Sequence, residues 1–143
     1  MKLRFLLFIL TAILSFGCKK YNQTPVPNIP FDITLDIYLP SYDALNGVGG
    51  WAYYNNAGSK GIIIYRRSID EFVAFDRHSP ADPNGTCATP LFPTSDNFLV
   101  LKDTCNNATF SLYDGSPMSN CDFMLRQYKT SYNGTNLLRI YNN

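Results

Sequence analysis

The stretch FDRHSPADPNGTC, from Phe75 to Cys87, gathers two aspartates, a histidine and a cysteine in one turn-rich loop. These side chains are common ligands of metal ions in proteins. His78 is the single histidine in 143 residues, and its simplest interpretation is a solvent-exposed or turn-capping side chain. No Ser–His–Asp triad can be recognised, because His78 has no nucleophile at motif spacing.

Zinc and calcium are the ions that this region has the residue types to bind. A Cys3His zinc set would consist of Cys87, Cys105, Cys121 and His78. No two of these cysteines are two to four residues apart, and exported thiols tend to be oxidised, so we expect no zinc site. A calcium site would use Asp76, Asp82 and Asp103. Their spacing matches no known calcium loop, so weak binding of a divalent cation there stays an open alternative.

The N-terminus has the layout of a secretory signal. Lys2 and Arg4 precede an apolar run, and small residues lead to Cys18. The ending Leu-Ser-Phe-Gly-Cys resembles a bacterial lipoprotein signal, in which Cys18 would become the first residue and carry the acyl chains. We therefore expect residues 1–17 to be a signal peptide and the protein to be exported and lipid-anchored to the cell envelope. Lys19 replaces the Asp that usually retains lipoproteins in the inner membrane, which favours the outer membrane, facing the periplasm.

The remaining composition predicts one globular domain behind a tether. Without Lys2 and Arg4 the acidic and basic side chains nearly balance, so the chain lacks the basic surface that nucleic acid requires. Residues 18–30 carry the lipidated Cys and a Pro- and Asn-rich tether that is too polar and too rich in proline to form an element. The folded domain is expected over residues 31–143.

Short strands dominate the expected secondary structure. Phe31 to Leu39 alternates apolar and polar residues, which is typical of a strand with one buried face. Residues 41–50 read as a loop. Further strands are expected at Trp51–Tyr54, Gly61–Arg66, Phe72–Phe75 and Phe98–Leu101. Asn133-Gly134 between two strand-like runs predicts a hairpin with a two-residue type I′ turn. The pattern predicts an all-β domain.

The order of features from Phe72 onward resembles the Rieske iron–sulfur domain family, as found in lipoproteins of Bacteroidota. Phe110, Asp114-Gly115, the run Leu125–Tyr128 and Leu138-Arg139-Ile140 fill positions that the family pattern has after its second ligand loop. The resemblance implies an antiparallel β sandwich or barrel with a small loop-rich tip subdomain, here within about residues 76–122. It also implies, as an alternative function, electron transfer through a 2Fe–2S centre.

The four ligand positions of that family lack their ligands in this chain. Asp76-Arg77 and Phe110 fix the register, which places the Cys and His of the first loop on Ser79 and Ala81, and those of the second loop on Asp103 and Asn106. A Rieske centre requires two thiolates and two imidazoles. The chain has one histidine, so no realignment supplies both imidazoles, and we expect the cluster to be lost.

The resemblance also assigns the cysteines. Many members carry one additional Cys in each ligand loop, and these form a disulfide, which implies a Cys87–Cys105 bridge here. Cys121 occupies the position of the Pro in the family's Gly-Pro-Ala loop, so a Cys105–Cys121 bridge is the competing expectation.

Together these features predict a non-enzymatic binding or structural module of the envelope. Its partners would be the membrane, through the lipid anchor, and an envelope protein. A further alternative is that the exposed tip supports a partner lipoprotein or transporter. The sequence fixes neither the partner nor the oligomeric state.

Overall fold

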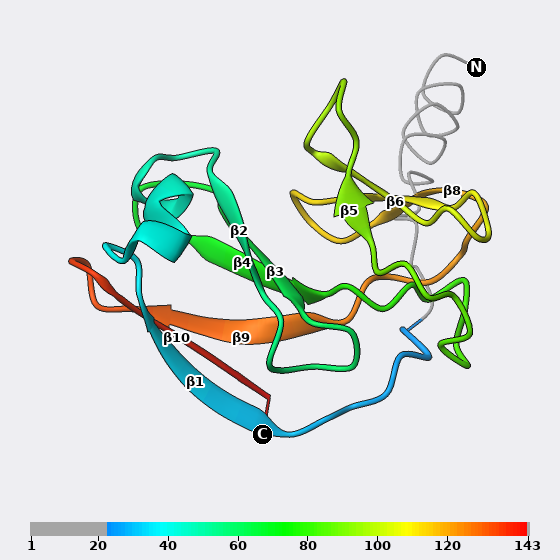
Figure 1. Ribbon diagram of the computed structural model, residues 1–143, viewed down its shortest axis with the longest axis horizontal. Coiled ribbons are helices and arrows are strands. Elements are labelled where there is room, and N and C mark those ends of the chain that lie inside the picture. Colours follow the sequence, from blue (N-terminus) through cyan, green and yellow to red (C-terminus); the bar gives the residue numbers. More distant parts are fainter. Residues whose placement is uncertain (1–22, 143) are drawn as a thin grey trace, which may run out of the picture.

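The computed structural model of the protein describes residues 23–142 (Figure 1). The predicted signal peptide and Cys18 therefore lie outside the described residues. The elements are β1 (Phe31–Asp36), η2 (Pro40–Asn46), β2 (Trp51–Tyr54), β3 (Ile62–Arg66), β4 (Phe72–Asp76), β5 (Phe92–Pro93), β6 (Val100–Lys102), β7 (Thr109–Ser111), β8 (Pro117–Ser119), β9 (Gln127–Tyr132) and β10 (Leu137–Asn142). Among the helices of this described part, none is long and apolar enough to cross a membrane.

Two antiparallel sheets make up the domain. The six-stranded sheet has the order β1-β10-β9-β4-β3-β2, and the four-stranded sheet has the order β5-β6-β7-β8. Figure 1 shows the smaller sheet at one end of the curled larger sheet. The prediction of an all-β, antiparallel fold is confirmed.

The strand β3 explains how the two hydrophobic cores are divided. Ile62 and Ile64 pack into one core with residues of β1, β4 and β10, whereas Ile63 packs into the other with Phe75 and residues of the smaller sheet. Because successive side chains of a strand point to opposite faces, a strand buried on both faces needs an unbroken apolar run. The sequence Ile-Ile-Ile-Tyr supplies that run, and every residue of β3 is buried.

The expected strands are present, with shifted ends. β1 ends at Asp36 rather than Leu39, because the backbone turns there: Leu39 N donates to Asp36 O over 3.2 Å. The expected loop after Pro40 contains a 3-10 helix, which buries Leu45 completely. The strand expected at residues 98–101 lies at Val100–Lys102.

The last hairpin forms, but the predicted two-residue type I′ turn is wrong. β9 ends at Tyr132 and β10 begins at Leu137, so the connection has four residues, 133–136. The side-chain oxygen of Asn133 accepts hydrogen bonds from the backbone N–H groups of Thr135, Asn136 and Leu137 at 2.9, 3.0 and 2.9 Å. An Asn side chain can hold a turn in this way without a positive φ of its own.

Part of the segment before β1, which its composition predicts to be a free tether, is packed against the domain. Val26 is only 1% exposed. Its carbonyl accepts hydrogen bonds from Nε and Nη2 of Arg126 at 2.8 and 2.5 Å. Asn28 and Ile29 are held by Asn142, whose Nδ2 lies 2.7 Å from Asn28 Oδ1 and 2.8 Å from Ile29 O. The chain is therefore fastened to the domain several residues before the first strand.

Candidate functional site: the disulfide-clamped tip

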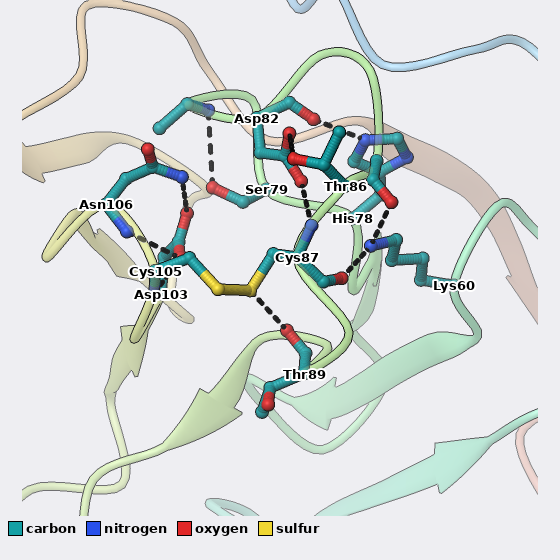
Figure 2. The surroundings of a disulfide bond; sticks show 12 residues. Lys60, His78, Ser79, Asp82, Thr86, Cys87, Thr89, Asp103, Cys105 and Asn106 are labelled. Carbon is teal, nitrogen blue, oxygen red and sulfur yellow. Dashed lines mark hydrogen bonds between the residues drawn. A yellow bond between two sulfur atoms is a disulfide. The ribbon is translucent and has the colours of Figure 1, made fainter.

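The tip consists of the loop that follows β4 and the loop that joins β6 to β7. A disulfide between Cys87 and Cys105 ties the two loops together, with a Cα–Cα distance of 6.0 Å (Figure 2). The pairing implied by the family resemblance is thus confirmed, and the competing Cys105–Cys121 bridge is not formed. Cys121 is a half-buried free thiol, and burial raises its pKa.

The four predicted ligand positions come together beside this disulfide. Asp103 is the centre of the group and is 2% exposed. Its Oδ1 accepts the backbone N–H of Asn106 at 3.1 Å, and its Oδ2 accepts Asn106 Nδ2 at 3.0 Å. Ser79, which is 6% exposed, hydrogen-bonds to Asp103 from the other loop and accepts the N–H of Ala81 at 3.2 Å. The two loops are therefore joined by hydrogen bonds as well as by sulfur.

The hydrogen bonds around Asp103 favour the ionised form of its carboxyl group. Burial raises the pKa of Asp103. Hydrogen bonds from Ser79, from Asn106 and from the backbone N–H of Cys105 lower it by more than burial raises it, so the net pKa lies below its ordinary value. These oxygen and amide groups are hydrogen-bonded to one another, so they hold the two loops together and are not free to bind a metal ion.

These residues do not fit a 2Fe–2S cluster of the Rieske type. That centre binds two thiolates and two imidazoles, whereas Ser79, Ala81, Asp103 and Asn106 offer a hydroxyl, a methyl group, a carboxylate and an amide. Within residues 23–142, one group of three potential metal ligands is found, formed by Cys87, Asp103 and Cys105. Their ligand atoms lie within 4.8 Å of one another. Because both sulfurs of that group are in the disulfide, neither is a thiolate, and the Cys3His zinc set is excluded for this oxidised form.

His78 is buried, so of its two expected interpretations the solvent-exposed one is wrong, and the turn-capping one fits its contact with Asp82 O. It is 3% exposed. Its Nε2 lies 2.8 Å from Asp82 O, and its Nδ1 lies 2.7 Å from Ser59 Oγ. A carbonyl oxygen can only accept, so Nε2 carries a proton, while the Ser59 hydroxyl is able to donate to Nδ1 or to accept from it. The imidazole braces the tip loop against the β2–β3 loop.

The contact with Ser59 gives His78 a hydroxyl neighbour that motif spacing did not reveal. In a catalytic triad a carboxylate would orient the other ring nitrogen. Here Nε2 meets a main-chain carbonyl, and Asp76 accepts the backbone N–H of His78 at 2.7 Å instead of contacting the ring. The pair therefore has the geometry of a loop brace.

Asp76 anchors the base of the tip. It is fully buried and accepts hydrogen bonds from the N–H groups of Ser59 and Lys60 at 2.6 and 3.2 Å. The hydroxyl of Tyr128 donates to it over 2.5 Å. Burial, with this hydrogen bond, raises the pKa of Tyr128 far above its ordinary value. Sequence reasoning missed Ser59, Lys60 and Tyr128 as tip residues, because they come from loops and strands distant in sequence.

Asp82 and Lys60 hold the far side of the loop. Asp82 Oδ2 accepts the backbone N–H of Cys87 at 2.7 Å and Oδ1 accepts the Thr86 hydroxyl at 2.9 Å; the Cys87 hydrogen bond is the main reason that the pKa of Asp82 is lowered. Lys60 Nζ donates to the carbonyls of Gly85 and Cys87. The proposed calcium ligands Asp76, Asp82 and Asp103 are thus each engaged by donors of the protein, and they do not form one group.

The tip is polar, closely hydrogen-bonded and covalently clamped. A comparison of the chain with models of protein families, with characterised proteins and with solved structures finds no match.

Proposed function

We propose that the protein is a lipid-anchored protein of the bacterial envelope whose Rieske-like domain no longer binds a 2Fe–2S cluster, and that it serves as a non-enzymatic binding or structural module. One observation carries this proposal. The two loops that would enclose a cluster are closed on each other by the Cys87–Cys105 disulfide and by the contacts of Asp103 with Ser79 and Asn106.

The supply of ligands supports the same conclusion. The chain has one histidine, and both ring nitrogens of His78 already have partners within the protein. A Rieske centre would have to break the disulfide and the brace of His78 to obtain thiolate and imidazole ligands. The domain would lose the contacts that hold its tip.

Electron transfer through a Rieske centre is the rival function, and iron reconstitution separates the two. Residues 19–143 are incubated anaerobically with iron and sulfide and desalted, and visible absorption and EPR spectra are recorded after reduction. We expect no stoichiometric 2Fe–2S signal. A Rieske protein carried through the same procedure is the control, and a reducible signal at one cluster per chain would refute the proposal.

The envelope assignment rests on the sequence around Cys18 and on Lys19. With the anchor on Cys18, the module would remain in the periplasm at the outer membrane, where its disulfide is stable against reduction. A partner would be another envelope protein, and a crosslinking experiment on intact envelopes is the direct way to identify it.

A further inference from the structure

The chain enters the domain at a fixed point, because the segment before β1 is packed against it. Val26 is buried, and its carbonyl accepts two hydrogen bonds from the guanidinium of Arg126. Asn28 Oδ1 accepts a third hydrogen bond from Arg126 Nη1 at 3.3 Å and one from Asn142. Pro25 and Pro27 on either side of Val26 have a fixed φ, which stiffens the segment further. From Val26 onward the chain therefore moves with the domain.

This point lies at the tip end of the six-stranded sheet. The N–H of Asp76 donates to Arg126 O over 2.9 Å, and Asp76 is the last residue of β4, from which the tip loop starts. β4 and β9 are antiparallel, with Ala74 opposite Tyr128. The start of β4 and the end of β9 are therefore at the opposite end, which carries the turns at residues 67–71 and 133–136. Figure 1 shows the blue N-terminal segment on the side of the tip loops and these turns on the other side.

The connection from Cys18 to this point is short. Eight residue steps separate Cys18 from Val26, and a fully extended chain covers at most about 29 Å in that number of steps. A folded domain of this size has a radius of gyration of about 14 Å, and hence a diameter of roughly 35 Å. Because this reach is shorter than the diameter of the domain, the attached end cannot face away from the membrane while the opposite end rests on it.

We infer that the anchored domain rests with its tip end against the lipid headgroups and with its turn end facing away from the membrane. The inference rests on the proposed lipidation of Cys18. The occupant of the tip-end surface is the bilayer itself. Lys19 and Lys20 in the connecting segment favour anionic headgroups, which strengthens the same arrangement.

The orientation also decides which side chains are presented to the periplasm. Large apolar side chains that are exposed at the turn end include Tyr38 (61%), Leu39 (51%), Ile69 (71%) and Leu137 (42%). Tyr38 and Leu39 follow β1, whose last residue Asp36 pairs with Leu137, and Ile69 lies in the turn between β3 and β4. A domain seated on its tip end holds these side chains on its outer surface, beyond the reach of the bilayer.

Paramagnetic broadening of backbone amides tests the orientation. The full lipidated chain, isotope-labelled, is placed in nanodiscs of phosphatidylethanolamine and phosphatidylglycerol that contain a gadolinium-chelating lipid. We expect the amide signals of Gly85 and Arg126 to lose most of their intensity, while those of Ile69 and Leu137 keep theirs. Equal broadening at both ends, or stronger broadening at the turn end, would overturn the inference.

A variant with a longer connection is the matched control. Inserting about 20 Gly and Ser residues between Tyr21 and Asn22 adds an average reach of roughly 25 Å, so the difference between the two ends should disappear while membrane attachment is kept. Intact mass spectrometry separates the two hypotheses. Acyl chains on Cys18 with equal broadening in the native chain refute the orientation alone, whereas a chain without acyl groups refutes the anchoring and the orientation together.

Discussion

The hydroxyl of Tyr128 donates a 2.5 Å hydrogen bond to the buried carboxyl group of Asp76, and this bond joins β9 to the end of β4 directly beneath the tip. The same carboxyl group accepts the backbone N–H of His78, the second residue of the tip loop. A contact between two strands of the larger sheet thus positions the loop that the disulfide closes.

Replacing Tyr128 by Phe removes one donor to a buried charged group. We expect Tyr128→Phe to lower the free energy of unfolding by about 1.5–3 kcal/mol, the usual range for hydrogen bonds to charged groups. Urea unfolding measures the change. Tyr132→Phe is the control on the same strand, because the hydroxyl of Tyr132 bonds to Thr135 O in an exposed turn. Equal losses in the two variants would contradict the role given to Asp76.

The absence of a side chain at Gly58 leaves room for the hydrogen bond between Tyr128 and Asp76. A Cβ atom at this position would lie 2.7 Å from Asp76 Oδ2 and 2.9 Å from the Tyr128 hydroxyl, and its φ is +74°. We expect Gly58→Ala to destabilise the domain by about 2–4 kcal/mol, from overpacking and backbone strain together. Gly134→Ala has a similar φ of +80° but nothing within 4 Å, so it isolates the strain. If the two variants unfold at the same urea concentration, the close packing at Gly58 is refuted.

The disulfide should be the largest single contribution to the stability of the tip. Its two cysteines are 18 residues apart, and closing a loop of that length is worth about 3 kcal/mol in the chain-entropy model. We expect the double variant Cys87→Ser/Cys105→Ser to lose that amount in urea unfolding. Cys121→Ser should change stability by less than about 1 kcal/mol, as substitutions outside the large-effect mechanisms do. Unreduced peptide mapping should recover residues 87 and 105 in one linked fragment, and free thiols at both positions would contradict the pairing.

Asp103 should make stability depend on acid pH. Its pKa in the folded state is lowered, so the folded state binds its proton less tightly than the unfolded chain does. The stability it contributes is therefore fully present above the unfolded pKa of about 3.9 and is lost as the pH falls through the lower folded value. We expect Asp103→Asn to be less stable than the native chain at pH 7 and to lose less on acidification.

Urea unfolding curves recorded from neutral pH down to about pH 2 test this pH dependence, because a carboxyl group with a lowered pKa loses its contribution to stability within that range. Asp96→Asn, in an exposed turn, is the control and should leave the acid limb unchanged. If Asp103→Asn loses as much stability on acidification as the native chain, other groups cause the pH dependence.

Lipid anchoring predicts a simple change of location. Cys18→Ser removes the only site for the acyl chains, and stable membrane attachment requires more than one chain. The variant should appear in the soluble periplasmic fraction, whereas the native protein sediments with the outer membrane. Unchanged sedimentation of the variant would refute the anchor, and Cys121→Ser serves as the control for loss of a cysteine.

The sequence by itself determined the fold class and most of the strands. Alternation in the first strand and the unbroken apolar run of β3 report burial directly, because side chains of a strand alternate between faces. The Cys87–Cys105 pairing came from family resemblance, and the shortage of imidazoles came from a count.

Only the tertiary structure decided how the tip is held. The sequence leaves His78 either solvent-exposed or turn-capping. The structure decides for a buried, turn-capping side chain, because its partners Ser59 and Asp82 come from different loops whose meeting depends on the pairing of β3 with β4. The burial of Val26 depends in the same way on Arg126, 100 residues further along the chain. Local patterns report periodicity within one segment, whereas such contacts exist only after the sheets have assembled, so no pattern around either residue could have revealed them.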